Sequence, residues 1–128
     1  MKCYIAITDE ENWKIILSKN MYGVSERHKK VYNAVNIGDK LIFYVKPKRV
    51  SGVFEICSKI NDPRNNWGLY VHQMNLKPIK VLDRLLVLEL DFINSLDLFK
   101  NKLWGPTLNG KALLEITKND FDKFYFLF

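Results

Sequence analysis

The chain has 128 residues, with 20 lysines and arginines against 14 acidic residues, a formal net charge of +6 and a pI near 9.3. A chain of this length can bury one hydrophobic core, so we expect a single domain over residues 1–128. The apolar fraction of 48% excludes a disordered tail. The positive charge favours an anionic partner, with nucleic acid the first candidate.

The sequence also limits the compartment. Cys3 and Cys57 are the only cysteines, and no Cys-x-x-Cys pair occurs. Two cysteines do not make the disulfide framework of a secreted domain, so we expect two free, buried thiols in a cytoplasmic protein. No apolar run approaches the length of a membrane span or of a signal peptide, so no membrane partner is expected.

The chain begins with a predicted strand and helix. Apolar residues over Cys3–Ile7 predict the strand. A Thr-Asp-Glu-Glu capping box starts at Thr8, whose hydroxyl can accept a hydrogen bond from the Glu11 amide. The helix then runs to about Lys19, with Trp13 on its buried stripe, and we expect it to stop at the following asparagine.

A second helix and two strands follow. Ser25 is a suitable cap for a helix over about Glu26–Val35. Apolar runs predict strands at Lys40–Val45 and Gly52–Ile60, joined by a loop that contains Pro47.

The second half of the chain is less regular. Residues 61–66 form the clearest loop, and Trp67–Leu76 alternates so that His72 and Met74 point to one face and Gln73 to the other. Pro78 interrupts this pattern, and the segment from 84 to 100 is ambiguous. Further elements are predicted at Ile79–Leu82, as a short helical turn at Asp91–Leu96, as a strand at Leu113–Ile116 and as a helix capped by Thr117.

This order predicts an α+β fold. Two helices are inserted between the first and second strands, and the later strands have no helical crossovers. A mainly antiparallel, strongly curved sheet follows from that order, with a small barrel as its natural closure.

Positive charge is concentrated in one segment. Between Val24 and Val50 stand seven basic residues and two acidic ones, next to an aromatic-glycine pair at Tyr22 and Gly23. That pair and a basic helix start suit a flat ligand beside phosphate, because stacking and charge attraction act together. The candidate contacts to a nucleic-acid backbone are Arg27, His28, Lys29, Lys46, Lys48 and Arg49. The last three could equally be a solvated hairpin.

Several segments in this order resemble one family. They are Tyr4–Thr8, Glu11–Trp13, Tyr22–Lys29, Gly38–Val45, Gly52–Ile56, Leu76–Ile79, Trp104, Gly110–Ala112 and Asp120–Phe121. The pattern is similar to archaeal-type, stand-alone EVE-domain proteins of the PUA-like superfamily, which are similar to YTH domains that read methylated adenine in an aromatic cage. The resemblance covers nearly the whole chain and implies a PUA-like pseudo-barrel with a pocket for a modified base.

The resemblance also implies roles for particular residues. Tyr22, followed by Gly23 and Val24, stands where the first cage aromatic is expected, and Trp67 is the candidate for the second. The turn that contacts the base edge carries Thr8, Asp9 and Asn12. Trp104 matches a family tryptophan that either closes the pocket or supports the barrel. An aspartate accepts hydrogen bonds and cannot donate them, so Asp9 favours an adenine or cytosine edge.

Little in the sequence points to catalysis. The two histidines and two cysteines have no zinc-ligand spacing, and no glycine-rich phosphate loop follows a strand. Ser25 and His28 could form a nucleophile and base, but a capping serine would already be occupied. We therefore expect no enzyme, cofactor or metal. The expected function is a monomeric, non-catalytic module that binds a modified base, flipped or single-stranded, in DNA or RNA. The alternatives are a general PUA-type RNA-binding domain and a small-molecule or nucleotide sensor.

Overall fold

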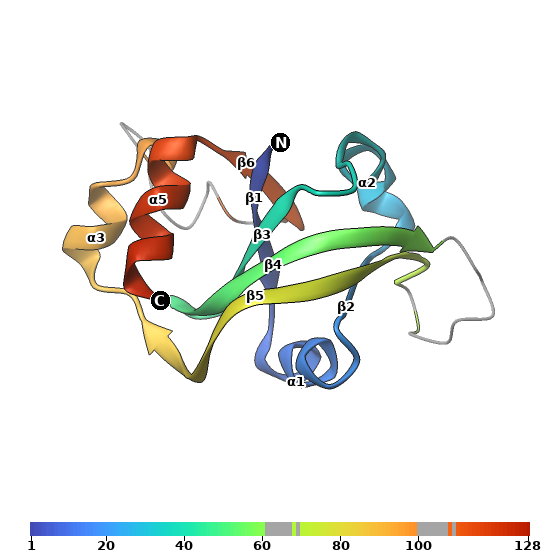
Figure 1. The fold of residues 1–128 in the computed structure, drawn as a ribbon, viewed down its shortest axis with the longest axis horizontal. Coiled ribbons are helices and arrows are strands. Elements are labelled where there is room, and N and C mark those ends of the chain that lie inside the picture. The colour runs from blue at the N-terminus through green and yellow to red at the C-terminus, as the bar shows by residue number, and fades with distance from the viewer. Residues whose placement is uncertain (61–67, 69, 100–107, 109) are drawn as a thin grey trace.

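The computed structural model describes residues 1–60, 68, 70–99, 108 and 110–128. Its elements are shown in Figure 1. They are β1 (Cys3–Thr8), α1 (Glu10–Lys19), β2 (Met21–Val24), the 3₁₀ turn η1 (Glu26–His28), α2 (Lys29–Ala34), β3 (Lys40–Val45), β4 (Arg49–Ile60), β5 (His72–Val87), α3 (Leu90–Asn94), the 3₁₀ turn η2 (Asp97–Phe99), β6 (Leu113–Ile116) and α5 (Lys118–Leu127).

One curled sheet organises the fold. Its six strands follow the order β2-β5-β4-β3-β1-β6. Every neighbouring pair is antiparallel except β1 and β3, which run parallel. The long strands β4 and β5 change register at several points, and such irregularities bend a sheet. The predicted α+β fold with a curved, mostly antiparallel sheet is confirmed.

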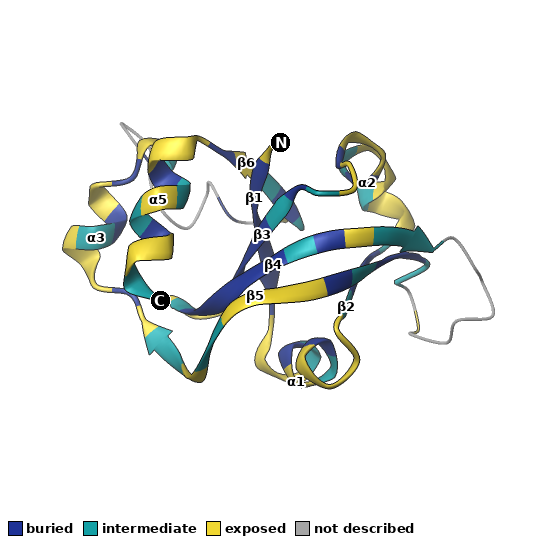
Figure 2. Cartoon of the chain, viewed as in Figure 1, coloured by how far each residue is buried: buried dark blue, intermediate teal, exposed yellow. Residues whose placement is uncertain are grey.

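Both faces of the sheet are covered (Figure 2). The core on one face includes Trp13 of α1, Tyr32 of α2 and Phe43 of β3. The core on the other includes Ile42 of β3 and Phe124 of α5. Alternate residues of β3 thus enter different cores, as the two-residue period of a strand requires. The prediction that Trp13 lies in the core is confirmed, since it is 4% exposed.

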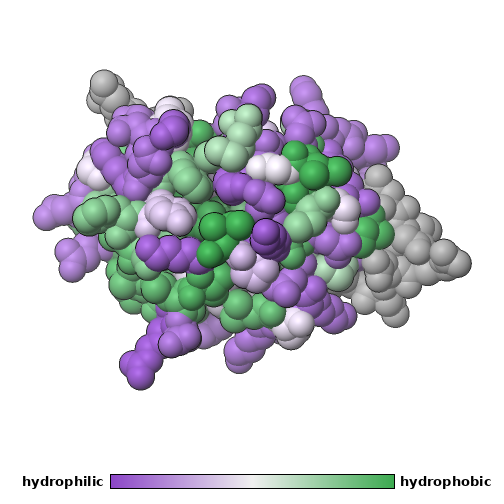
Figure 3. All heavy atoms as spheres, viewed as in Figure 1, coloured by the Kyte–Doolittle hydropathy of each residue, from purple (hydrophilic) through white to green (hydrophobic). Residues whose placement is uncertain are grey.

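The helices α3 and α5 lie side by side at one end of the molecule (Figure 1), where the rings of Phe92 and Phe124 are 5.2 Å apart. Figure 3 shows apolar surface near the C-terminal end of α5 among hydrophilic side chains. Exposed apolar residues include Val87, Leu90 and Phe126. None of the helices in the described ranges is long and apolar enough to span a membrane.

The first helix begins one residue later than predicted. The N-cap is Asp9, not Thr8, and its carboxylate accepts a hydrogen bond of 2.7 Å from the Asn12 amide. Both residue types cap helices, and Asp9 stands directly before the helix, where its carboxylate reaches the amide at the third helical position. The predicted stop at Asn20 is confirmed, because this residue takes the left-handed conformation with φ of 51°.

A short strand divides the two helices that were predicted to follow one another. This strand, β2, pairs with the start of β5, so that Tyr22 lies opposite Met74. Ser25 stands at the N-cap position of η1 as predicted, but its side chain makes no capping hydrogen bond. The helical segment there is a 3₁₀ turn followed by α2, which ends at Ala34, rather than one helix to Val35.

The prediction of two buried thiols was wrong for one of them. Cys3 is buried but Cys57 is exposed. Gln73 and Met74, predicted to point to opposite faces, are both buried, because the sheet is covered on both sides at this point. The strand prediction around Pro78 was also too short, since β5 continues through it to Val87.

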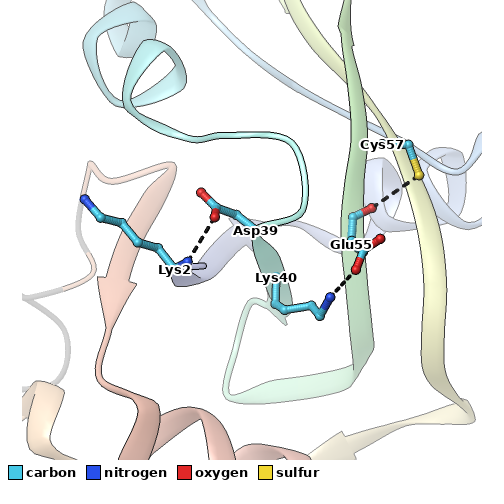
Figure 4. A network of polar contacts seen from close by, with 5 residues as sticks. All are labelled: Lys2, Asp39, Lys40, Glu55 and Cys57. Carbon is cyan, nitrogen blue, oxygen red and sulfur yellow. Dashed lines mark hydrogen bonds and ion pairs between the residues drawn. The ribbon is translucent and has the colours of Figure 1, made fainter.

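A polar network fixes the start of β3 (Figure 4). The backbone amide of Lys2 donates to the buried Asp39 carboxylate over 2.9 Å. Next to it, Lys40 forms an ion pair with Glu55 of β4, and the hydrogen bond from Lys40 lowers the pKa of that carboxyl. Cys57 contacts the backbone of Glu55 at the exposed end of this network. The network holds β1, β3 and β4 in register.

Candidate functional site

A pocket of about 490 Å³ lies where the end of β1 and the start of α1 face β2. Its volume falls within the range of about 300–1,000 Å³ that is usual for ligand pockets. All six described residues that the sequence singled out as base-binding line it together: Thr8, Asp9, Asn12, Tyr22, Gly23 and Val24. The two remaining candidates, Trp67 and Trp104, lie outside the described residues.

The rest of the wall is divided by chemistry. Its apolar part consists of Ile7, Ile15, Ile16 and Ala112, and its polar and basic part of Ser25, His28, Lys46, Tyr70 and Lys111, with Gly68 beside them. Gly68 directly follows Trp67 in the sequence. A mostly apolar wall with a few placed polar groups is typical of sites for small or flat ligands.

Tyr22 is an integral part of the fold. Its side chain is only 4% exposed, and its ring meets Phe43 edge to face with centroids 5.2 Å apart. Its hydroxyl lies 3.1 Å from the carbonyl oxygen of Ile7 and 3.0 Å from that of Ala112. Burial, and then the neighbouring Tyr70, raise the pKa of this hydroxyl, so it remains a donor. Tyr22 thus connects the edge strand β2 to β1 and to the segment before β6, and presents little free ring surface.

We therefore expect Tyr22→Phe to lower the free energy of unfolding by about 1 kcal/mol, because one buried hydrogen bond is lost while the ring stays. Urea denaturation followed by tryptophan fluorescence measures this. Tyr125→Phe is the matched control, since Tyr125 is 39% exposed on α5. Equal stability of the two variants would contradict the structural role of the Tyr22 hydroxyl.

Three side chains form the polar part of the pocket near α1. The Asn12 amide nitrogen donates to the Asp9 carboxylate over 3.3 Å and to the Tyr70 hydroxyl over 3.2 Å. The buried Gln73 in turn donates to the Tyr70 backbone carbonyl over 2.8 Å. These bonds hold Tyr70, which is half-buried, against the pocket.

Basic residues from three separate segments gather on the same pocket. They are His28 of η1, Lys46 after β3 and Lys111 before β6. Arg27 donates to the Gly110 carbonyl over 3.3 Å, which fixes the segment that carries Lys111 next to η1. Partial burial, then Arg27, then Lys111 lower the pKa of His28.

The other predicted backbone contacts do not line the pocket. Lys29 lies 3.8 Å from the Glu26 carboxylate. Arg49 pairs with Glu10 over 3.4 Å, so its charge is already balanced. Lys48 is exposed at the turn between β3 and β4. Of the three hairpin cations, only Lys46 reaches the pocket.

Sequence reasoning missed Tyr70, Lys111 and Ser25 as pocket residues. Tyr70 follows the clearest loop of the chain, and an aromatic residue there was a usable signal. Ser25 was dismissed as an occupied cap, although its hydroxyl makes no capping bond. Lys111 had no local signal, because β6 and β1 bring it to the pocket from the far end of the chain. Within the described ranges, no group of three metal-ligating side chains lies together.

Comparisons with known proteins identify the family. No family model matches the chain. A UPF0310 protein of Pyrococcus abyssi is 31% identical over an alignment of 140 positions. The alignment covers 94% of this chain and 95% of that protein. The chain belongs to the UPF0310 family. A second UPF0310 protein, from Pyrococcus horikoshii, is 32% identical over 143 residues and covers 94% of each chain.

Solved structures share the fold of this UPF0310 chain. A complex of the Mmi1 YTH domain-containing protein with RNA has a TM-score of 0.70 at 13% identity, covering 98% of this chain and 80% of that one. The YTH domain of Zygosaccharomyces rouxii MRB1, bound to N6-methyladenosine RNA, has a TM-score of 0.62 at 19% identity, covering 98% and 86%. Protein Atu2648 of Agrobacterium tumefaciens has a TM-score of 0.66 at 11% identity, covering 99% and 92%.

Proposed function

We propose that this UPF0310 chain is a non-catalytic nucleic-acid-binding module that holds a modified, methylated base in the pocket between β1 and β2. One observation carries the proposal: the same pocket is lined by Thr8, Asp9 and Asn12 and by the segment Tyr22–Val24. The likeness of the fold to YTH domains solved with RNA supports it. The sequence resemblance to EVE-domain proteins also supports the proposal. It implies that the whole chain is a single PUA-like domain.

The binding energy must come from both the base and the phosphate backbone of the nucleic acid. Unstacking a base costs a few kcal/mol, and each aromatic side chain that stacks on it returns about 1–3 kcal/mol. Tyr22 is too buried to offer a full ring face. Among the described residues, Tyr70 is the better candidate for stacking on the base, and Trp67 is a further candidate. The basic side chains at the pocket supply the remaining affinity by contacting phosphate.

The polar side chains suit an exocyclic amino group. The Asp9 carboxylate accepts hydrogen bonds from Asn12 and cannot donate any itself. Its remaining lone pairs can accept from the amino group of adenine or cytosine. The carboxamide oxygen of Asn12 accepts in the same way.

Replacing Tyr70 with alanine should weaken binding of the preferred methylated oligonucleotide by about 1–3 kcal/mol, because the stacking surface is lost. The experiment is a fluorescence titration with methylated and unmodified single-stranded DNA and RNA oligonucleotides at two salt concentrations. Tyr70→Phe is the matched control and should keep most of the stacking energy while losing the hydrogen bond from Asn12.

The titration also separates the alternative functions. Equal affinity for methylated and unmodified oligonucleotides would contradict base reading and leave a general RNA-binding domain. Binding of free nucleosides without any salt dependence would indicate a small-molecule sensor. A catalytic role for Ser25 has little support, because within the described residues its hydroxyl forms no hydrogen bond with the His28 ring.

A further inference from the structure

Three residues that line the pocket are not among those expected to hold the base. They are Ser25, His28 and Lys111, and each offers a donor. The Ser25 hydroxyl is not used for capping, and within the described part of the chain no carboxylate pairs with Lys111. The His28 backbone amide donates to the Ser25 carbonyl over 2.9 Å, and Lys111 is close enough to lower the pKa of His28. A hydroxyl, an imidazole and an ammonium group on these neighbouring segments match the acceptor oxygens of a phosphate.

The backbone around Lys111 is shaped to keep this group close to η1. Gly110 has a φ of +71°, a conformation that glycine adopts without strain. A side chain at this position would meet the Arg27 guanidinium at 3.0 Å. Since Arg27 also donates to the Gly110 carbonyl, the two segments are fixed side by side although 83 residues separate them.

Positive charge exceeds negative charge around His28. His28 faces Arg27 from its own turn and Lys111 from the segment before β6, and both disfavour its protonation. The acid of η1, Glu26, is engaged by His72 over 2.9 Å and lies 3.8 Å from Lys29. Among the described residues that line the pocket, Asp9 is the one acidic residue, and it caps α1.

We propose that Ser25, His28 and Lys111 form a phosphate subsite that holds a phosphate of the same nucleotide whose base enters the pocket. The inference rests on the proposed function and extends it, since it makes the nucleotide and not the nucleoside the unit of recognition. Arg27 is a positioning residue, because it acts by holding the Gly110 segment.

The test begins with inorganic phosphate alone and uses the two histidines of the chain. Proton NMR follows both imidazole rings while phosphate replaces chloride at constant ionic strength. Bound phosphate favours the charged imidazole, so we expect the pKa of His28 to rise towards its ordinary value. His72, which pairs with Glu26, is the internal control and should not respond.

Lys111→Gln should weaken this phosphate response about tenfold, as expected for the loss of one charged hydrogen bond. Ser25→Ala should weaken it less. Lys118→Gln removes the same charge from α5, which packs on the other core of the sheet, and should leave the response unchanged. An absent His28 response, or an equal response in wild type and Lys111→Gln, overturns the subsite.

Nucleotides complete the test. Wild type should bind the 5′- or 3′-monophosphate of N6-methyladenosine, or of 5-methylcytidine, about tenfold more tightly than the nucleoside, and Lys111→Gln should abolish the difference. Oligonucleotides with the same base placed internally or at a phosphorylated end separate a diester from a terminal monoester. Equal affinity for nucleoside and monophosphates overturns the subsite but leaves the base pocket. A specific phosphate response without affinity for any nucleoside supports the anion site and overturns base reading.

Discussion

Phe43→Ala should lower the free energy of unfolding by about 3–5 kcal/mol, because it leaves a large cavity in the core behind the pocket. The Phe43 ring is fully buried and lies within 5.4 Å, centroid to centroid, of Trp13 and within 5.2 Å of Tyr22 and of Phe54. These contacts join α1, β2 and β4 to β3 at one point. Urea denaturation followed by circular dichroism measures the loss.

A second phenylalanine shows whether the loss of stability comes from burial or from the loss of any aromatic ring. Phe126 is 91% exposed on α5, so Phe126→Ala should change stability by less than about 0.5 kcal/mol. Phe43→Leu keeps most of the volume and should cost less than Phe43→Ala. Because Phe43 supports the Tyr22 ring, we also expect the folded Phe43→Leu variant to bind nucleotides more weakly. A loss below about 1 kcal/mol in Phe43→Ala would show that this aromatic cluster does not hold the pocket wall.

Elements that depend on local patterns could be predicted from the sequence. The strand Lys40–Val45 is bounded as predicted, because a glycine turn precedes it and a proline follows it. Thr117 caps α5, and its hydroxyl accepts from the Asp120 amide over 3.1 Å. In both cases the decisive contacts lie within a few residues along the chain, so a local pattern carries enough information.

Elements that depend on distant partners could not be predicted in this way. The strand Met21–Val24 has four residues and exists because it pairs with β5, some fifty positions later in the chain. Tyr22 and Val24 favour strands, but a run of four residues with a glycine at the third position is too short to predict a strand from the sequence. The same applies to Lys111, which reaches the pocket only because β6 pairs with β1.

The pocket shows the same division. Thr8 ends β1, Asp9 caps α1 and Asn12 lies in its first turn, and all three line the pocket, because they follow a strand that the sequence predicts. Tyr22 also lines the pocket, but its burial depends on the Ile7 and Ala112 carbonyls that its hydroxyl reaches. Sequence alone could not distinguish a tyrosine that stacks on a ligand from one that closes the sheet, because both stand beside a glycine near a turn.

Gly52→Ala should destabilise the protein by about 3 kcal/mol, although it adds only one methyl group. A Cβ atom at Gly52 of β4 would lie 2.6 Å from the Lys80 carbonyl oxygen and 2.8 Å from the Val81 Cα of β5. Both are backbone atoms, so the strands would have to separate where their register already shifts. Thermal and urea denaturation should show the loss.

Gly38→Ala is the matched control for Gly52→Ala. Gly38 has a φ of +95°, but no atom lies within 4 Å of a Cβ built there. Gly38→Ala should therefore lower the free energy of unfolding by only about 1–2 kcal/mol, because of backbone strain. Separation of β4 from β5 would also disturb the strand that carries Gln73, whose side chain holds the Tyr70 backbone at the pocket. We therefore expect Gly52→Ala, but not Gly38→Ala, to weaken oligonucleotide binding even where both are folded. Equal losses of stability in the two variants would mean that β5 can move away from β4 at little cost.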